Sequence, residues 1–318
     1  MSVDVETVIE RRQLRRQVGL WRGLAILAGV VVLAAFAAVR ASDSGVLAQG
    51  QIARVTIEGM ITDDRKRLQM LDKIAKADHV KGLIVYVNSP GGTATGGEGL
   101  YKALRQVAEK KPVVAQFGTV AASAAYMAGL GTDHIVAREN SITGSVGVIM
   151  QWPNVKGLLE KLGVRMNQLK SGELKAEPNP FEDMTPAVRQ HTMQMIQESQ
   201  RWFVNLVETR RKIAASSVPG LLEGAVYSGR AARDYKLVDA LGSEDDAKAW
   251  MVKERKVASE LRVVDWKPRS DFGWPTSGAL AWIGSLVGFD VDAFRRLAPE
   301  LSAVGLDGLL LVWQPSKS

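Results

Sequence analysis

The sequence predicts an α/β protein built on a parallel sheet. Two apolar stretches, residues 82–88 and 112–118, have the continuous hydrophobic character of strands buried on both faces. A turn and a helical pattern follow each of them, which is the order found in right-handed β-α-β crossovers. The chain has 318 residues, of which 46% are hydrophobic, so it is long enough to bury such a core.

The neighbouring segments extend this pattern in both directions. Residues 53–61 alternate as a strand does, and residues 64–77 form an amphipathic helical pattern. SPGG at residues 89–92 is typical of a turn, and a helix is expected from there to about Glu109. The later segments predict, in order, a helix starting at Ser123, strands at 134–140 and 145–150, a helix at 155–163, a loop at 171–186, a long helix from about Pro186 to Ala214, and a short helix, a turn and the start of another helix within 229–242.

Composition excludes several kinds of chemistry. Cysteine is absent, which rules out a thiol nucleophile, a cysteine metal site and a disulfide framework. The three histidines, His79, His134 and His191, lack the spacing of a helical zinc site, so we expect no metal and no cofactor. The net charge of +7 is modest and its basic residues are scattered outside the N-terminus, so no nucleic-acid partner is expected.

The N-terminal region has the pattern of a membrane anchor. Residues 23–39 carry no charge and follow an arginine-rich stretch, at the short end of what spans a bilayer. The positive flank would keep the N-terminus in the cytoplasm and send the rest across the membrane. A cleaved signal peptide is the alternative, because Ala35-Phe36-Ala37 fits a cleavage site, but Arg40 and the length of the run favour an uncleaved anchor.

These observations predict five regions. They are a basic cytoplasmic N-terminus at 1–22, a transmembrane anchor at 23–40, a linker at 41–50, the α/β domain at 51–265, and a tryptophan-rich extension at 266–318. The extension contains Trp266, Trp274, Trp282 and Trp313, and its apolar stretches are too short to span a bilayer. It would form either a C-terminal subdomain or oligomer contact, or a segment lying against the bilayer surface.

Ser123 is the candidate nucleophile, although packing is the ordinary explanation of a lone serine among small residues and the rest of the sequence must supply the case for catalysis. It lies in GTVAASAAYMAG, residues 118–129, where a strand is expected to give way to a helix. The N–H of Ala124 would then lie in the first turn of a helix, where N–H groups have no hydrogen-bond partner within the helix. It would be free to donate to an oxyanion. Gly91 or Gly92 would supply a second donor if the two preceding strands are neighbours.

A nucleophilic serine also needs a base. The histidines are poorly placed, and the candidate is Lys175 in SGELKAEP, for which an ordinary solvated lysine is the alternative. A lysine acts as a base near neutral pH only if burial lowers its pKa, by up to roughly 3 to 5 units. A lysine amine buried in a dry cleft also needs a polar neighbour to hold it, and Ser145 in TGSVGV offers a hydroxyl for this.

Five stretches together resemble the signal peptide peptidase A group, of the short single-domain kind, within the S49 serine peptidases. They follow the family's order and spacing between about residues 52 and 250, and they are VNSPGGT, AASAAYMAG, SITGSVGVIM, SGELKAEPNPFEDMT and VYSGRAARDYKLVDALG. The resemblance implies the β-α-β superhelix of the Clp-protease and crotonase superfamily. It also implies a Ser-Lys dyad of Ser123 and Lys175, supported by Ser145, with oxyanion donors at the SPGG turn and at Ala124.

The resemblance further implies a homo-oligomeric, dome-like assembly on the outer face of the bacterial inner membrane. Its substrates would be signal peptides left in the membrane lipid bilayer after preprotein cleavage, and similar hydrophobic peptides. The chain departs from the family at two places. Ser123-Ala124-Ala125 replaces the usual Ser-Gly-Gly, so two methyl groups would narrow the pocket, and Ala176 replaces an Asp that often follows the lysine.

Three other interpretations remain open. A Clp-type protease would need a histidine about 25 residues after Ser123, where the chain has Val148. A crotonase-type enzyme would share the oxyanion hole and bind coenzyme A, but it would need neither the anchor nor the Lys175 loop. A catalytically inactive, membrane-tethered scaffold of the same fold is the third, and the Ala124-Ala125 pair keeps it open.

Overall fold

A computed structural model of the chain describes residues 19–23, 26–27, 29–30, 50–268 and 310–312. The chain divides into two compact units, one formed by residues 1–50 with 77–79 and the other by residues 51–76 with 80–318. In the first unit, residues 19–23, 26–27 and 29–30 are helical, and most of the predicted anchor at 23–40 lies outside the described residues. Within the described parts of the chain, no helix combines the length and the apolar character that a membrane crossing requires.

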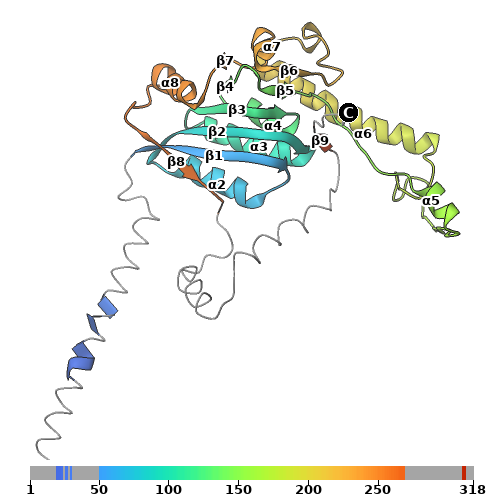
Figure 1. The fold of residues 1–318 in the computed structure, drawn as a ribbon, viewed down its shortest axis with the longest axis horizontal. Coiled ribbons are helices and arrows are strands. Elements are labelled where there is room, and N and C mark those ends of the chain that lie inside the picture. Colours follow the sequence, from blue (N-terminus) through green and yellow to red (C-terminus); the bar gives the residue numbers. More distant parts are fainter. Residues whose placement is uncertain (1–18, 24–25, 28, 31–49, 269–309, 313–318) are drawn as a thin grey trace, which may run out of the picture. The chain divides into compact units, whose positions relative to one another are not determined.

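The second unit is built around one mixed sheet, which the sequence predicts correctly as an α/β arrangement (Figure 1). Its central order is β6-β5-β3-β2-β1-β8, with β4 and β7 continuing beside β3 and with β9 beside β2. All pairings are parallel except β5 with β6 and β2 with β9. The strands are β1 (Gln51–Ile61), β2 (Val80–Thr93), β3 (Val113–Ala122), β4 (His134–Ala137), β5 (Ile142–Gly144), β6 (Val226–Ser228), β7 (Ala240–Leu241), β8 (Arg262–Trp266) and β9 (Leu310–Val312).

Helices cover both faces of the sheet because its side chains alternate between two apolar layers. Leu83, Val85 and Val87 of β2 are fully buried. Helix α3 contacts both α2 and α4, and all three helices contact this strand. Ile84, on the opposite face of β2, belongs to a cluster with Met251 of α8. The described helices are α2 (Arg65–Lys76), α3 (Ala94–Ala108), α4 (Ala124–Leu130), α5 (Lys156–Lys161), α6 (Pro186–Arg211), η1 (Ala215–Ser217), α7 (Gly229–Asp234) and α8 (Glu244–Arg255).

Three of the expected elements are wrong in detail. SPGG does not form a turn, because β2 continues through it, and Gly91 with its φ of 118° bends the strand while still pairing with Met60 of β1. Residues 145–150 do not form the expected strand. The preceding strand β5 ends at Gly144, and Ser145 has a φ of 52°, which interrupts the extended backbone. The helix expected near residue 242 is instead the short strand β7, followed by α8 from Glu244.

The segment between β5 and α6 extends away from the sheet and carries α5 with it (Figure 1). At its end Thr185 caps α6 by accepting a hydrogen bond from Val188 N (3.3 Å). The far half of α6 is anchored in the core through Phe203 and Val207, both fully buried. The projecting segment instead exposes large apolar side chains, namely Leu158, Leu162, Val164, Met166, Leu169 and Leu174.

Candidate active site

Ser123 occupies a strained position at the junction of β3 and α4. Its backbone has φ 58° and ψ −120°, a conformation that L-residues rarely adopt and that costs about 1–3 kcal/mol. Two hydrogen bonds hold the turn in place, from Ser123 N to Gly144 O and from Met127 N to Ser123 O, both 2.9 Å long. Hydrolases present nucleophilic serines on sharp strand-to-helix turns of this kind.

The Ser123 hydroxyl is buried without a hydrogen-bond partner. The residue is 1% exposed, and its Oγ is the one buried side-chain nitrogen or oxygen atom of the described residues that has no partner. Neighbouring hydroxyls are satisfied: Ser141 Oγ donates to Gly118 O (2.6 Å), and Thr143 Oγ1 donates to Ala121 O (2.7 Å). Because leaving a buried polar group unpaired costs about 1–3 kcal/mol, Ser123 lowers the stability of the fold in a second way.

The small residues after Ser123 are explained by packing. Every residue of α4 is buried, and a Cβ at Gly97 of α3 would lie only 3.0 Å from the Cβ of Ala124. The methyl group of Ala124 therefore faces α3, where close approach of the two helices requires glycine. Packing accounts for Ala124 and its neighbours, but it does not account for the strained backbone and unpartnered hydroxyl of Ser123.

The two glycines of SPGG lie beside the end of β3, as the proposed oxyanion hole requires. β2 and β3 are parallel neighbours, and Ser89 pairs with Ala121, two residues before Ser123. Gly91 N donates to Ser89 Oγ (3.1 Å), which in turn donates to Gly59 O (2.6 Å). A Cβ at Gly92 would lie 1.8 Å from Ile61 O, so the sheet leaves room only for glycine there.

Ser145 lies next to Ser123 for a topological reason. Ala122 of β3 pairs with Gly144 of the parallel strand β5, and the two serines are the residues that directly follow this pair. Ser145 also has a positive φ, and its N–H donates to Ala225 O (2.8 Å). The structure thus brings together Ser123, Ser145 and the glycine pair at one edge of the sheet.

The structure does not bring Lys175 to Ser123 within one chain. Lys175 is exposed on the projecting segment, and its amine does not reach the unpartnered Ser123 Oγ. Ala176, the next residue, has a φ of 60°. Of the predicted dyad, one chain therefore assembles only the serine half.

The histidines are not bonded to Ser123 either, since its Oγ has no partner. His134 stacks on Trp250, with ring centroids 4.6 Å apart, and its Nδ1 lies 3.7 Å from Asp239 Oδ2. Burial lowers the pKa of His134, against the opposing effect of Asp239. His134 is therefore part of the packing between β4 and α8, and it does not serve as a base for Ser123 in this chain.

Comparison with known proteins identifies the family. The model of peptidase family S49 matches residues 105–258, and the model of Clp protease matches residues 47–142. A protein of Enterococcus faecium named as a putative signal peptide peptidase SppA is 30% identical over 251 residues, which cover 74% of this chain and 71% of that protein. The chain belongs to peptidase family S49.

Two further relatives of this S49 chain are named as putative proteases. The one from Synechocystis is 35% identical over 201 residues, covering 63% of this chain and 73% of the relative. The one from Methanocaldococcus jannaschii is 38% identical over 185 residues, covering 58% of this chain and 60% of the relative. The expected Clp-protease-like α/β fold and S49 membership are thus confirmed, and Ser123 lies within both matched regions.

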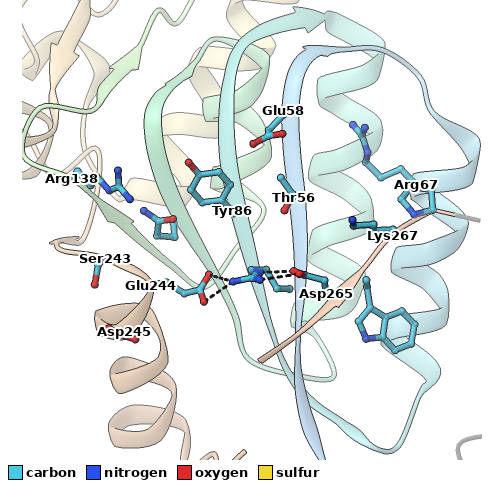
Figure 2. Close-up of a pocket in the computed structure, with 14 residues that line it drawn as sticks. Thr56, Glu58, Arg67, Tyr86, Arg138, Ser243, Glu244, Asp245, Asp265 and Lys267 are labelled. Atoms are coloured by element: carbon cyan, nitrogen blue, oxygen red, sulfur yellow. Dashed lines mark hydrogen bonds and ion pairs between the residues drawn. The ribbon is translucent and has the colours of Figure 1, made fainter. Parts of the chain in front are cut away.

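Figure 2 shows a large charged cavity of this S49 chain. Its volume is about 760 Å³, and its lining includes Tyr86, Arg138 and Lys267 but none of the predicted site residues. Arg54 crosses it, donating to both Glu244 (3.0 Å) and Asp265 (2.9 Å). These ion pairs tie β1 to α8 and β8, and the cavity presents no nucleophile comparable with Ser123.

Backbone conformation is the signal that sequence reasoning missed. Six non-glycine residues of the described chain have positive φ, and three of them are lysines at or near helix ends: Lys212, Lys236 and Lys256. The other three are Ser123, Ser145 and Ala176, two predicted site residues and the neighbour of the third. Strained positions gather at functional sites, so these three positions are candidates on the ground of backbone conformation, which residue type alone does not reveal.

Proposed function

We propose that this S49 chain is a membrane-anchored serine endopeptidase with a Ser123-Lys175 dyad. It would degrade remnant signal peptides and similar hydrophobic peptides, with its anchor in the bacterial inner membrane and its catalytic domain on the periplasmic side. The observation that carries the proposal is the buried, unpartnered hydroxyl of Ser123 on its strained turn. The name of the Enterococcus faecium relative supports the substrate class.

The reaction would be acyl transfer to water. Neutral Lys175 takes the hydroxyl proton of Ser123 while Oγ attacks a peptide carbonyl carbon. The N–H groups of Ala124 and of Gly92, or of Gly91 once it releases Ser89 Oγ, would stabilise the oxyanion, each donor being worth about 2.7–4 kcal/mol. Lys175 then gives its proton to the leaving amine, and water attacks the ester in a second cycle. Ser145 would hold the lysine amine between these steps.

The dyad would form between two copies of the chain. Ser123 Oγ bonds to no base among the described residues of its own chain, while Lys175 is exposed on a segment that also exposes Leu158, Leu162 and Leu169. A contact between copies would cover these apolar side chains and desolvate the lysine, which is what a neutral amine needs. We therefore propose a homo-oligomer in which one copy supplies the serine and its neighbour supplies the lysine.

The substrate would bind as an added strand. The backbone of β9 pairs antiparallel with β2 from Gly91 to Thr93, so an extended main chain fits against these residues. A peptide that takes the place of β9 would put a carbonyl beside the glycine pair, and main-chain pairing accepts many sequences. Hydrophobic segments without defined structure, such as released signal peptides, match this binding mode.

The test is hydrolysis of a synthetic signal peptide by the full chain in detergent, with Ser123→Ala and Lys175→Ala beside it. Each variant should lose at least about a hundredfold in kcat. A mixture of the two inactive variants, assembled together, should regain activity at about a quarter of the sites, because either copy can supply what the other lacks. Full activity of Lys175→Ala would refute the dyad, and an inert wild type that is folded and assembled would favour the scaffold.

A further inference from the structure

The loop that carries Lys175 receives no support from the core. Residues 171–176 are all exposed, and Lys175 N donates to Gly172 O (3.1 Å) within the loop itself. A base must hold its proton-accepting atom within hydrogen-bonding reach of the nucleophile, and small misplacements are costly. Something outside residues 171–176 must therefore fix the loop.

A cluster of polar side chains closes the loop at its base. Lys170 Nζ contacts Glu177 Oε1 and lies 3.0 Å from Glu182 Oε2, so it joins the residues on either side of the loop. We call Lys170, Glu177, Asn179 and Glu182 the Lys170 cluster. Its members Lys170 and Glu177 have side chains only 17% and 8% exposed, although the loop between them is exposed throughout.

Glu177 is fixed from a second direction. Asn179 Nδ2 donates to Glu177 Oε1 (2.7 Å), and Asn179 Oδ1 accepts a hydrogen bond from Phe181 N (2.8 Å). Hydrogen bonding to Glu177 raises the pKa of Lys170, and the same contact lowers the pKa of Glu177, so both stay charged near neutral pH. The carboxylate therefore keeps its contacts under ordinary conditions.

A further bond links the loop to α6. Thr185 Oγ1 donates to Glu173 Oε1 (2.9 Å), and Thr185 is the N-cap residue of α6. The other end of α6 is held in the core, where Arg210 donates to Leu130 O and Thr132 O (both 2.9 Å). The loop is thus connected through α6 to α4, the helix that Ser123 precedes.

We propose that Lys170 and Glu177 are positioning residues that hold the Lys175 loop in the shape needed to present its amine to Ser123. The inference rests on the proposed function, since it assigns a task to a loop whose lysine is the base. Neither Lys170 nor Glu177 is bonded to Ser123 Oγ, and on this proposal they act by restricting the loop and not by binding substrate. Their removal would leave the binding of substrate intact and reduce the time that the amine spends in reach of the hydroxyl.

The same segment offers a matched control. Lys156 Nζ and Asp183 Oδ2 form an ion pair of 2.6 Å, and Asn154 Nδ2 also donates to Asp183 (3.2 Å). This pair resembles the Lys170 cluster in composition, but it joins residues 27 positions apart and so closes the whole projecting segment, whereas Lys170 and Glu177 close the Lys175 loop at its base. Asp183→Asn therefore measures the general effect of losing an ion pair from the projecting segment.

The experiment compares Lys170→Met, Glu177→Gln, Lys170→Arg and Asp183→Asn in the full, assembled chain with the signal-peptide substrate. Lys170→Met and Glu177→Gln should lower kcat about 10- to 100-fold with KM within about twofold. Lys170→Arg keeps a cation that can pair with two carboxylates and should stay within about threefold. Asp183→Asn should stay within about twofold of wild type.

The pH profile of kcat/KM separates positioning from two other causes. Lys170→Met removes a positive charge and Glu177→Gln removes a negative one. A purely electrostatic effect of these charges on Lys175 would therefore move the acid limb of the pH profile in opposite directions in the two variants. Loss of positioning leaves the amine more solvated and should move the acid limb to higher pH in both. A variant that merely unfolds or dissociates would lose rate equally at every pH, and thermal unfolding and oligomer size measured on each variant detect this.

Two outcomes would overturn the inference, and they differ in what else they refute. If Glu177→Gln and Asp183→Asn have equal effects, or the acid limbs move apart, the Lys170 cluster does not position the loop, while the dyad stands. If Lys175→Ala retains full activity in the same assay, the proposed dyad fails and the loop carries no base to position.

Discussion

Ser123 should make the protein less stable than it would be without its nucleophile. Two features of the structure carry this prediction: the backbone of Ser123 at φ 58° and ψ −120°, and its buried Oγ without a partner. Ser123→Ala removes only the hydroxyl. Ser123→Gly removes the hydroxyl and also the Cβ that makes this backbone conformation unfavourable. Comparing the two substitutions separates the two costs.

The expected gains follow from these costs. Removing an unsatisfied buried hydroxyl recovers about 1 kcal/mol or more, which is the expected effect of Ser123→Ala. Relief of backbone strain adds about 1–3 kcal/mol in Ser123→Gly, less about 0.5–1 kcal/mol for the greater freedom of glycine in the unfolded chain. For a domain of this size about 1 kcal/mol shifts Tm by roughly 2–4 °C. Ser123→Ala should therefore raise Tm by about 2 °C or more. In Ser123→Gly a mid-range net gain of about 1 kcal/mol should raise Tm by roughly a further 2–4 °C.

The measurement is thermal unfolding of the full chain at one scan rate in one detergent. Ser141→Ala is the control, because Ser141 is equally buried but its Oγ accepts from Arg138 N (3.0 Å) and donates to Gly118 O (2.6 Å). This substitution should lower Tm, since it leaves buried partners unsatisfied. A fall in Tm for both Ser123 variants would refute the reasoning, because the turn would then be neither strained nor short of a hydrogen bond.

Two further predictions concern stability. Burial lowers the pKa of His134, so the unfolded chain binds a proton more readily, and the free energy of unfolding should fall as pH drops below about 6.5. His134→Phe, which keeps an aromatic ring against Trp250, should flatten this part of the profile measured by urea unfolding. Gly92→Ala should lower Tm more than Gly59→Ala, because the new methyl group at position 92 would lie 1.8 Å from Ile61 O. A methyl group at position 59 meets no neighbouring atom, so Gly59→Ala destabilises the fold only by placing alanine in a left-handed backbone conformation. Equal losses would mean that β1 moves aside freely.

Most of the fold could be predicted, because the spacing of hydrophobic residues along the sequence indicates which segments form buried strands and which form helices. The buried strands around residues 82–88 and 112–118 and the helices after them follow from local pattern alone. One of the errors occurs where glycine was taken to end a strand. At SPGG the strand continues because β1 runs beside it, and this long-range pairing leaves no trace in the local sequence.

The candidate site was predictable in its serine half and only partly in its lysine half. Ser123, Ser145 and the glycine pair meet because they end adjacent parallel strands, which the β-α-β order implies. If the dyad forms between copies as proposed, the place of Lys175 depends on how the projecting segment packs against a neighbouring copy, and the residue pattern of one chain does not describe that contact. The positive φ of Ser123 depends on the packing of α4, so it could not be predicted from the sequence either.

The two halves of the proposed dyad are built in different ways, and this difference has a mechanistic consequence. Ser123 is held by a wholly buried helix, and a strained turn persists only where its surroundings determine it fully. The nucleophile therefore cannot move to meet a base, and all adjustment must come from the exposed loop of Lys175. A loop of this kind becomes accurate only when its ends are fixed and its surface is covered. On this proposal, contact between copies both desolvates the lysine and completes each active site, so a separated chain holds a serine that has no base to activate it.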